Sequence, residues 1–304
     1  MTEIKLIAVD LDGTLLNSDH KISERTADAL RKAVAQGIKV VLATGKTPFS
    51  GRDIVKQFGI DAPGIYVQGL TVVFPDGETK QLAQLDAGLA RSVITFAEER
   101  GFDVIAYSGG QTYTRVDNVG ARELTEAYGE SAPQIVGPLQ NMLDSTPISK
   151  LLFFKRREPR KITALRWQLG TQINGKARLV QALDDALEML PTGASKGKAL
   201  KLVLKDLGID AKEVLAIGDG ENDIEMIELA DIGVAMGNAS PKLKAVAKHE
   251  VASNDADGVA EALERFVLKA EAPKTETPPA AESTETSSAE TQPDEKAAES
   301  DKKE

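Results

Sequence analysis

Four short apolar runs in this chain lack the alternation of apolar and polar residues that marks a half-exposed strand. They are IKLIAV at residues 4–9, IKVVLA at 38–43, EVLAI at 213–217 and IGVAM at 232–236. A strand that is covered on both faces is apolar throughout, and such strands are typical of parallel sheets flanked by helices. The four runs therefore predict a buried parallel sheet.

Amphipathic segments between these runs supply the helices that a parallel sheet requires. Residues 23–37 (SERTADALRKAVAQG) and 195–208 (SKGKALKLVLKDLG) carry apolar residues at helical spacing, and both stop at glycine. Ser195 is placed to cap the second helix. The succession of strand, helix and strand indicates an α/β fold with a Rossmann-like parallel-sheet core.

The segment 83–188 has a different pattern. Two alternating runs, FDVIAY and QTYTRV, are joined by Ser108-Gly109-Gly110, and a second pair, KARLVQAL and ALEMLP, flanks Asp184-Asp185. Paired alternating runs around such turns predict β-hairpins, and helical stretches accompany both pairs. We therefore expect an α+β cap domain at 83–188, inserted into a core domain made of residues 1–82 and 189–268.

Residues 269–304 contain no aromatic residue and no Val, Ile or Leu. Such a segment cannot bury enough apolar surface to offset the entropy lost on ordering, so we expect a disordered acidic C-terminal tail. Ten acidic and four basic residues give 270–304 a net charge of −6, which leaves −4 of the total −10 for the rest of the chain. A solvating tail is the simpler interpretation, and a docking segment for a partner is the alternative.

Composition excludes several classes of function. The chain has no cysteine and only two histidines, His20 and His249. Thiolate chemistry is therefore excluded, and a histidine-rich zinc site has too few ligands. A net negative charge argues against binding to nucleic-acid phosphates. No apolar run approaches the roughly 18 residues of a membrane span, and a strand-like run begins already at Ile4 where a leader peptide would lie. We expect a cytoplasmic protein with neither a nucleic-acid nor a membrane partner.

Polar side chains follow three of the predicted strands, where each strand ends. Asp10 and Asp12 follow the first run, Thr44 follows the second, and GDGEND, which contains Asp219, follows the third. Ligands of open α/β sheets bind beyond the carboxyl ends of the strands, so these side chains should meet at one edge. Residues two apart in extended chain project to the same side, which places both N-terminal carboxylates in one cavity with Leu11 turned into the core.

Carboxylates gathered in this way need a cation, because like charges a few ångströms apart resist ionisation. Hard oxygen donors without histidine or cysteine favour Mg²⁺. A phosphate ester fits beside such an ion. The Thr44 hydroxyl, the backbone N–H groups near Gly13 and Gly45, and Lys196 at a helix start are suitable phosphate donors. A calcium loop is excluded, because Gly13 is the fourth residue of DLDG where an EF-hand requires glycine at the sixth.

These residues suggest a mechanism of phosphate ester hydrolysis. Asp10 attacks phosphorus and forms an aspartyl-phosphate, while Asp12 protonates the leaving alcohol and then activates the water that releases phosphate. Mg²⁺ and Lys196 stabilise the charge on the phosphoryl oxygens.

Four segments, DLDGTLL, ATGK, the Lys196 region PTGASKGKAL, and GDGEND, resemble the four motifs of the haloacid dehalogenase-like phosphatases. The insertion between the second and third motifs resembles the Cof-type branch, and the resemblance covers residues 1 to about 267. It implies that Asp10 is the nucleophile and Asp12 the general acid/base. It also implies that Mg²⁺ is bound by the Asp10 and Asp219 side chains and the Asp12 carbonyl, supported by Asp223. By the same resemblance, Thr44, Lys196 and Asn222 hold phosphate.

Two departures from the family pattern concern substrate recognition. The family commonly has Arg where this chain has Lys46, and Asn-Gly-Ala where this chain reads Gln68-Gly69-Leu70. Within the expected cap, Arg115 and Asp117 either face the site and select substrates or are solvated charges beside a hairpin turn.

The predicted function is a Mg²⁺-dependent phosphatase acting on a small phosphorylated metabolite, such as a sugar phosphate or a cofactor precursor. A phosphomutase using the same intermediate is one alternative. A non-catalytic module that binds a phosphometabolite is another, although such a binder has no need of the acid/base Asp12.

Overall fold

The computed structural model describes residues 3–118, 120–123, 130–183 and 185–268, and the predicted tail at 269–304 lies outside them. The central sheet has five parallel strands in the order β14-β13-β12-β1-β2, which confirms the predicted parallel core. Their bounds are Leu6–Val9 for β1, Lys39–Leu42 for β2, Val214–Gly218 for β12, Ile232–Ala235 for β13 and His249–Glu250 for β14.

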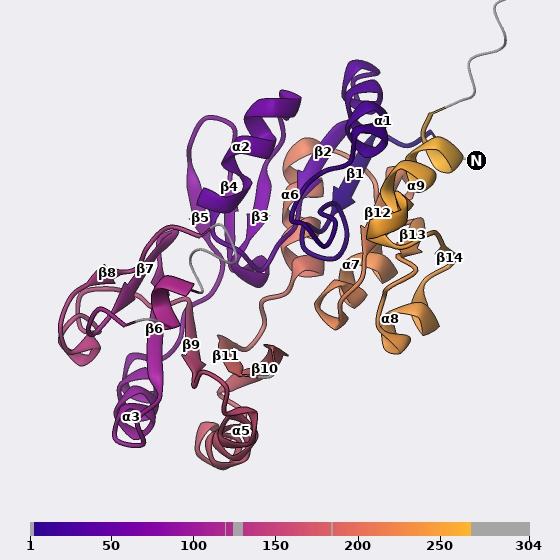
Figure 1. Cartoon of the computed structure of the whole chain (residues 1–304). Coiled ribbons are helices and arrows are strands. Elements are labelled where there is room, and N and C mark those ends of the chain that lie inside the picture. The colour runs from indigo at the N-terminus through magenta and orange to yellow at the C-terminus, as the bar shows by residue number, and fades with distance from the viewer. Residues whose placement is uncertain (1–2, 119, 124–129, 184, 269–304) are drawn as a thin grey trace, which may run out of the picture. The chain divides into compact units, whose positions relative to one another are not determined.

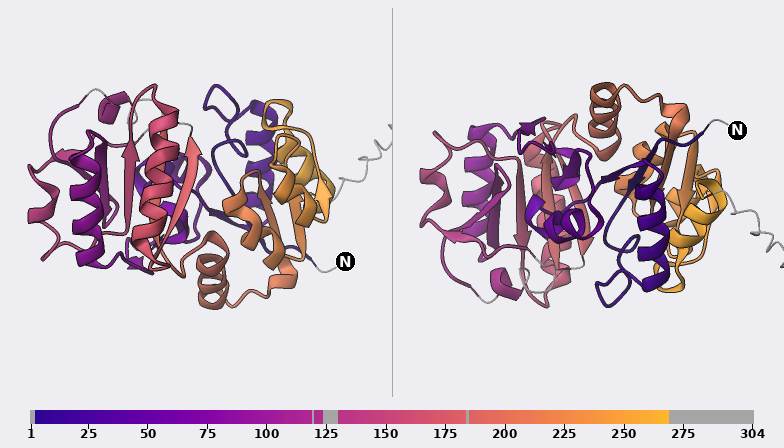
Figure 2. Two further views of the ribbon diagram at one scale, coloured as in Figure 1. Left: turned by 90° about the horizontal axis from the view of Figure 1, so that it is seen from below. Right: turned by 90° about the horizontal axis from the view of Figure 1, so that it is seen from above.

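Helices cover both faces of this sheet, as the apolar strands require (Figure 1). The four strands β1, β2, β12 and β13 are almost completely buried. The helices are α1 (Glu24–Ala35), α2 (Pro48–Phe58), α6 (Lys196–Leu207), α7 (Ile224–Leu229), α8 (Pro241–Val246) and α9 (Gly258–Phe266). Helix α1 packs against α9, and Figure 2 shows this pair on the side of the sheet opposite α6. Ser195 caps α6 as predicted, because its hydroxyl accepts the backbone N–H of Lys198.

The inserted segment forms a second sheet of six strands in the order β10-β11-β9-β6-β7-β8. Its elements are α3 (Ala87–Glu98), β6 (Asp103–Ser108), β7 (Gln111–Thr114), β8 (Gln134–Ile135), β9 (Lys150–Phe154), α5 (Pro159–Ile173), β10 (Ala177–Leu183) and β11 (Ala186–Pro191). Both predicted hairpins are present, β6 with β7 and β10 with β11. Strand β11 pairs through Pro191, so this sheet extends three residues past the predicted boundary at 188.

Strand β9 joins the two hairpins, and no hairpin pattern could have revealed it. Its sequence KLLFF is buried at every position, so it lacks the alternation that marks a half-exposed strand. It pairs antiparallel with β6 on one side and with β11 on the other. Its burial follows from those neighbours and from the apolar cores of α3 and α5 that cover the sheet.

A small antiparallel sheet continues the core beyond β2. It contains β3 (Gly64–Tyr66), β4 (Thr71–Val73) and β5 (Thr79–Gln81). Between β3 and β4 lies a tight turn, Val67–Gly69, in which Gln68 has φ 61° and ψ 29°. Within the described part of the chain, no helix is long and apolar enough to cross a membrane.

Candidate active site

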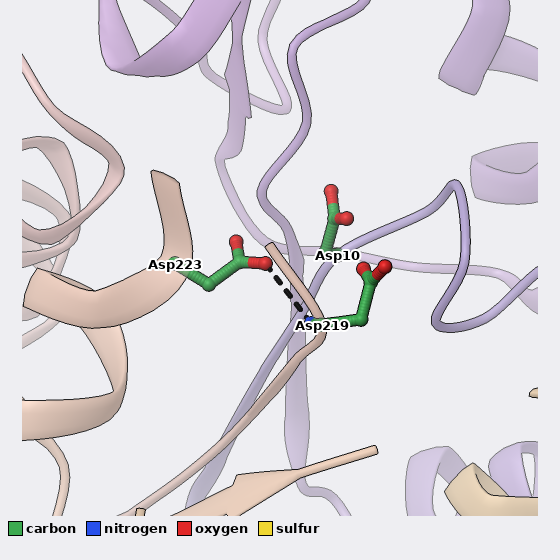
Figure 3. A group of neighbouring side chains, drawn as sticks. All are labelled: Asp10, Asp219 and Asp223. Carbon is green, nitrogen blue, oxygen red and sulfur yellow. Dashed lines mark hydrogen bonds between the residues drawn. The ribbon is translucent and has the colours of Figure 1, made fainter. Parts of the chain in front are cut away.

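The carboxyl ends of β1, β2 and β12 meet at one edge of the parallel sheet, as expected for parallel neighbours. Asp10 follows β1, Thr44 follows β2 and Asp219 follows β12. Figure 3 shows the carboxylates of Asp10 and Asp219 beside that of Asp223. One oxygen from each of the three lies within 4.8 Å of the others. The tertiary structure thus brings Asp10 beside two acidic side chains that lie about 210 residues further along the sequence.

Lys196 is the cation within this group of carboxylates. Its Nζ lies 2.7 Å from Asp10 Oδ1 and 2.7 Å from Asp223 Oδ1, and its side chain is completely buried. Burial disfavours the charged ammonium, yet the two carboxylates outweigh burial and raise the pKa of Lys196 above its ordinary range. Lys196 therefore stays charged at the floor of the site.

The surroundings of Asp10 disfavour its ionised form. Burial raises its pKa well above the ordinary aspartate value, and although Lys196 lowers it, the charges of Asp223 and Asp219 raise it further. One ammonium cannot neutralise three carboxylates, so the fully ionised group carries two excess negative charges. The two positive charges of a divalent cation would balance this excess. The donor atoms are hard oxygens, which such cations prefer.

Asp219 is the most accessible member of the group to a metal. Its Oδ1 accepts a hydrogen bond of 2.9 Å from the Thr14 hydroxyl. A Cβ at Gly13, which has φ +75°, would lie 2.4 Å from Asp219 Oδ2, so only glycine leaves room for this carboxylate. Both oxygens of Asp223 are occupied: Oδ1 accepts from Lys196, and Oδ2 accepts from the backbone N–H groups of Asp219 and Gly220.

Asp12 stands apart from the acidic group. Its carboxylate lies 2.8 Å from the Nζ of Lys46 and is 37% exposed, whereas Leu11 between the two acids is fully buried. The two N-terminal aspartates thus have different surroundings. Asp10 is buried against Lys196, and Asp12 reaches solvent beside a second lysine.

Three of the predicted phosphate donors, Thr44, Gly45 and Asn222, line one cavity with a volume of about 780 Å³. Thr44 is buried, and its Oγ1 accepts the backbone N–H of Lys46 at 3.1 Å. Gly45 and Asn222 line the cavity together with Asp10, Asp12 and Asp219. Lys196 does not line the cavity itself, but its buried ammonium donates to Asp10, which does.

The inserted sheet contributes cavity residues that were not predicted from the sequence. Lys150 at the start of β9 and Glu188 in β11 form an ion pair of 2.9 Å, and both line the cavity. Each is the only charged residue of an otherwise apolar strand, which is a signal that could have found them. Arg166 and Arg178 line the same side. Arg115 pairs instead with Glu98 at 3.2 Å, and Asp117 pairs with Arg122.

Metal-free protein is expected to lose stability as the pH rises from about 4 to about 6. Burial and the charge of Asp223 raise the pKa of Asp219 from 3.8 to about 6. The folded state therefore binds more protons than the unfolded state in this interval. The stabilisation is complete below the unfolded pKa and is lost as the pH passes the folded value. The loss amounts to roughly 2–3 kcal/mol.

Urea unfolding in a chelating buffer at several pH values would measure this loss. The difference between the wild type and Asp219→Asn isolates the contribution of this carboxyl, because asparagine does not titrate. Added Mg²⁺ should flatten the wild-type profile, since metal ions bind the ionised form. An identical pH slope in both proteins would contradict the assignment of the titration to Asp219.

Comparison with known proteins identifies the architecture and its relatives. The family model for haloacid dehalogenase-like hydrolases matches residues 7–263. A crystal structure of a haloacid dehalogenase-like hydrolase from Bacteroides thetaiotaomicron superposes with a TM-score of 0.77 at 29% identity, covering 86% of this chain and 99% of the other. An HMP-PP phosphatase from Klebsiella pneumoniae is 30% identical over 247 residues, which is 81% of this chain and 88% of the relative.

A plant protein, the chloroplastic endoribonuclease YBEY of Arabidopsis thaliana, is 38% identical over 272 residues. The match covers 86% of this chain but spans only 46% of the plant protein. This chain thus spans less than half the length of that plant protein.

Proposed function

Because the chain belongs to the Cof-type haloacid dehalogenase-like hydrolases, we propose that it hydrolyses a small phosphorylated metabolite through an aspartyl-phosphate on Asp10. The chain is a phosphoric monoester hydrolase. The observation that carries the proposed mechanism is the contrast between its two N-terminal aspartates. Asp10 lies buried among Lys196 and two further carboxylates, and Asp12 lies beside Lys46 at the cavity wall.

In the proposed first step, an oxygen of Asp10 attacks phosphorus and the bond from phosphorus to the leaving oxygen breaks. Asp12 donates its proton to that oxygen, so the leaving group departs as a neutral alcohol. In the second step Asp12 takes a proton from water, the water oxygen attacks phosphorus, and the bond to Asp10 breaks. Phosphate is released, and both aspartates return to their starting states.

Donors around the cavity support the negative phosphoryl oxygens in this scheme. The Thr44 hydroxyl, the Gly45 backbone, the Asn222 amide and the Lys196 ammonium are the proposed contacts. The side chains of Asp10 and Asp219 with the carbonyl of Asp12 would hold Mg²⁺, and its chemistry there is charge neutralisation at phosphate. Asp223 would support the metal site without binding the ion directly, because both of its oxygens already accept hydrogen bonds.

The size of the cavity favours a small substrate. At about 780 Å³, with walls from the core and the inserted sheet, it has the size of a metabolite pocket. The relative named HMP-PP phosphatase acts, by its name, on a small phosphorylated compound. We propose the same substrate class here, with neither nucleic acid nor membrane as a partner. The cytoplasmic location expected from the sequence stays a prediction that cell fractionation can test.

Phosphate release across a panel of phosphorylated metabolites, with Mg²⁺ and with a chelator, tests the proposal. We expect release with at least one compound, dependent on the metal and without isomerised product. Isomerised substrate in place of free phosphate would indicate a phosphomutase. Tight binding without turnover would indicate a binding module, and cleavage of RNA with no phosphatase activity would overturn the proposal outright.

A further inference from the structure

Gln68 occupies a strained position between the core and the inserted sheet. Its backbone lies in the left-handed region with φ 61°, which is uncommon for a residue other than glycine. The side chain is 8% exposed, and it lines the cavity. A Cβ at Gly45 would lie 2.5 Å from Gln68 Nε2, so glycine at that position leaves space for this amide. Strain at a cavity wall is a reason to look for a role of the side chain.

The Gln68 amide joins a residue of the core to a residue of the inserted sheet, and both of these residues line the cavity. Its Oε1 accepts a hydrogen bond of 2.9 Å from Asn222 Nδ2 in the core. Its Nε2 donates a hydrogen bond of 3.3 Å to Glu188 Oε2 in the inserted sheet. A single side chain therefore connects a proposed phosphate contact to β11.

Glu188 is held in place by a buried lysine. Lys150 Nζ lies 2.9 Å from Glu188 Oε1, 4.1 Å from the centre of the Tyr107 ring and 3.4 Å from the carbonyl oxygen of Gly45. The Lys150 side chain is 3% exposed. A buried ion pair contributes little net stability, because the cost of desolvation offsets much of the attraction. The position of this pair at a cavity wall therefore suggests a role in the site.

The charge of Glu188 sets the direction of the whole chain of hydrogen bonds. An ionised carboxylate only accepts, so Gln68 must turn its NH₂ group toward Glu188 and its carbonyl oxygen toward Asn222. Asn222 must then turn its own NH₂ group toward Gln68. Its Oδ1 lies over Gly220, where a Cβ would approach it to 2.2 Å. The second N–H of Asn222 is left to donate into the cavity, which is the orientation that a phosphate oxygen needs.

We infer that Gln68 is a positioning residue that transmits the orientation set by the Lys150–Glu188 pair to the Asn222 amide, so that Asn222 presents a donor to phosphate. The inference rests on the proposed phosphate-binding role of Asn222. It also gives a role to one of the two departures from the family pattern. Without Gln68, the Asn222 amide is free to turn its carbonyl oxygen toward the anion and repel it.

A double-mutant cycle on Gln68 and Asn222 tests this inference. We expect Gln68→Ala to raise KM and the inhibition constant of inorganic phosphate about 3- to 10-fold, the range of one hydrogen bond. Turnover at saturation should stay nearly unchanged, because the contact is made equally in the ground state and the transition state. In an Asn222→Ala background, Gln68→Ala should have almost no further effect, since it acts through the amide that is missing.

Two further variants probe the origin of the orientation. Glu188→Gln can donate as well as accept, so it should weaken phosphate binding in the same direction as Gln68→Ala. Glu188→Gln also leaves the buried Lys150 ammonium without its partner. The double variant Lys150→Met/Glu188→Gln removes that unpaired charge, so it tests the effect of the amide at position 188 alone. Gln111→Ala, at an exposed glutamine of β7, is the matched control and should leave both constants unchanged.

The outcomes separate this inference from the proposed function. Equal effects of Gln68→Ala in the wild-type and Asn222→Ala backgrounds, with normal wild-type turnover, would overturn the inference alone. A loss of turnover at unchanged phosphate affinity would overturn it as well. A wild type that neither releases nor binds phosphate would overturn the proposed function and this inference with it.

Discussion

Asp10→Asn is expected to abolish phosphate release while the protein remains folded. Asparagine has nearly the same shape but cannot form the proposed phosphoenzyme, so the rate should fall by on the order of 10⁴-fold or more, as for other essential nucleophiles. Folding should be retained, because Asp10 is a buried carboxylate whose pKa is raised by burial and by the neighbouring acids. Removing that charge relieves repulsion with Asp219 and Asp223, and the Lys196 ammonium keeps Asp223 as its partner.

The measurement is steady-state phosphate release together with mass spectrometry of acid-quenched enzyme. Wild-type protein mixed with substrate should carry the added mass of one phosphoryl group, and the Asp10→Asn variant should carry none. Asp206→Asn, at an exposed position of α6, is the matched control and should retain full activity. Residual activity above a few per cent of the wild type in protein free of contaminating phosphatase would contradict the assignment of Asp10 as nucleophile.

Lys196→Met is expected to destabilise the protein and to remove most of its activity. Methionine fills the space of the side chain but leaves the carboxylates of Asp10 and Asp223 buried without their cation. Breaking a buried pair by removing one partner costs about 3–5 kcal/mol. Loss of a positive group beside the phosphoryl oxygens should lower the turnover number by about 10²- to 10³-fold.

Chemical denaturation and turnover should be measured with and without Mg²⁺ on the same samples. Added Mg²⁺ should restore part of the lost stability, because a metal at the acidic group replaces some of the missing positive charge, and it should not restore turnover. Lys198→Met changes the same charge two residues along α6 at an exposed position, so it serves as the control. If Lys196→Met were as stable as Lys198→Met, the buried triad of Lys196 with two aspartates would not have the energetic role described above.

The parallel sheet and the residues at its edge could be predicted from local sequence because each depends on one short segment. An apolar run without alternation indicates a strand covered on both faces, and the polar residue that ends it must lie at the carboxyl edge. Asp10, Thr44 and Asp219 were placed at one site by this argument, and the structure brings all three to one cavity. Asn222 and Asp223 lie in the segment that follows the same strand as Asp219, and the family resemblance, confirmed by the comparisons, added their expected roles.

The inserted sheet was only partly predictable. Each hairpin is a local structure, so the paired runs around Ser108–Gly110 and around Asp185 could be recognised. Strand β9 joins these hairpins by pairing with residues 32 to 51 positions away, and no local pattern specifies such a partner.

By itself the sequence determined the fold class, the family and the acidic edge of the core, because these follow from residues whose spacing is short and whose chemistry is unambiguous. Only the tertiary structure decided which groups neutralise one another across that edge. It placed Lys196 between Asp10 and Asp223, Lys46 beside Asp12, and Gln68 between Asn222 and Glu188. Charge and hydrogen-bond partners depend on distances of a few ångströms between segments distant in sequence, and folding alone sets those distances.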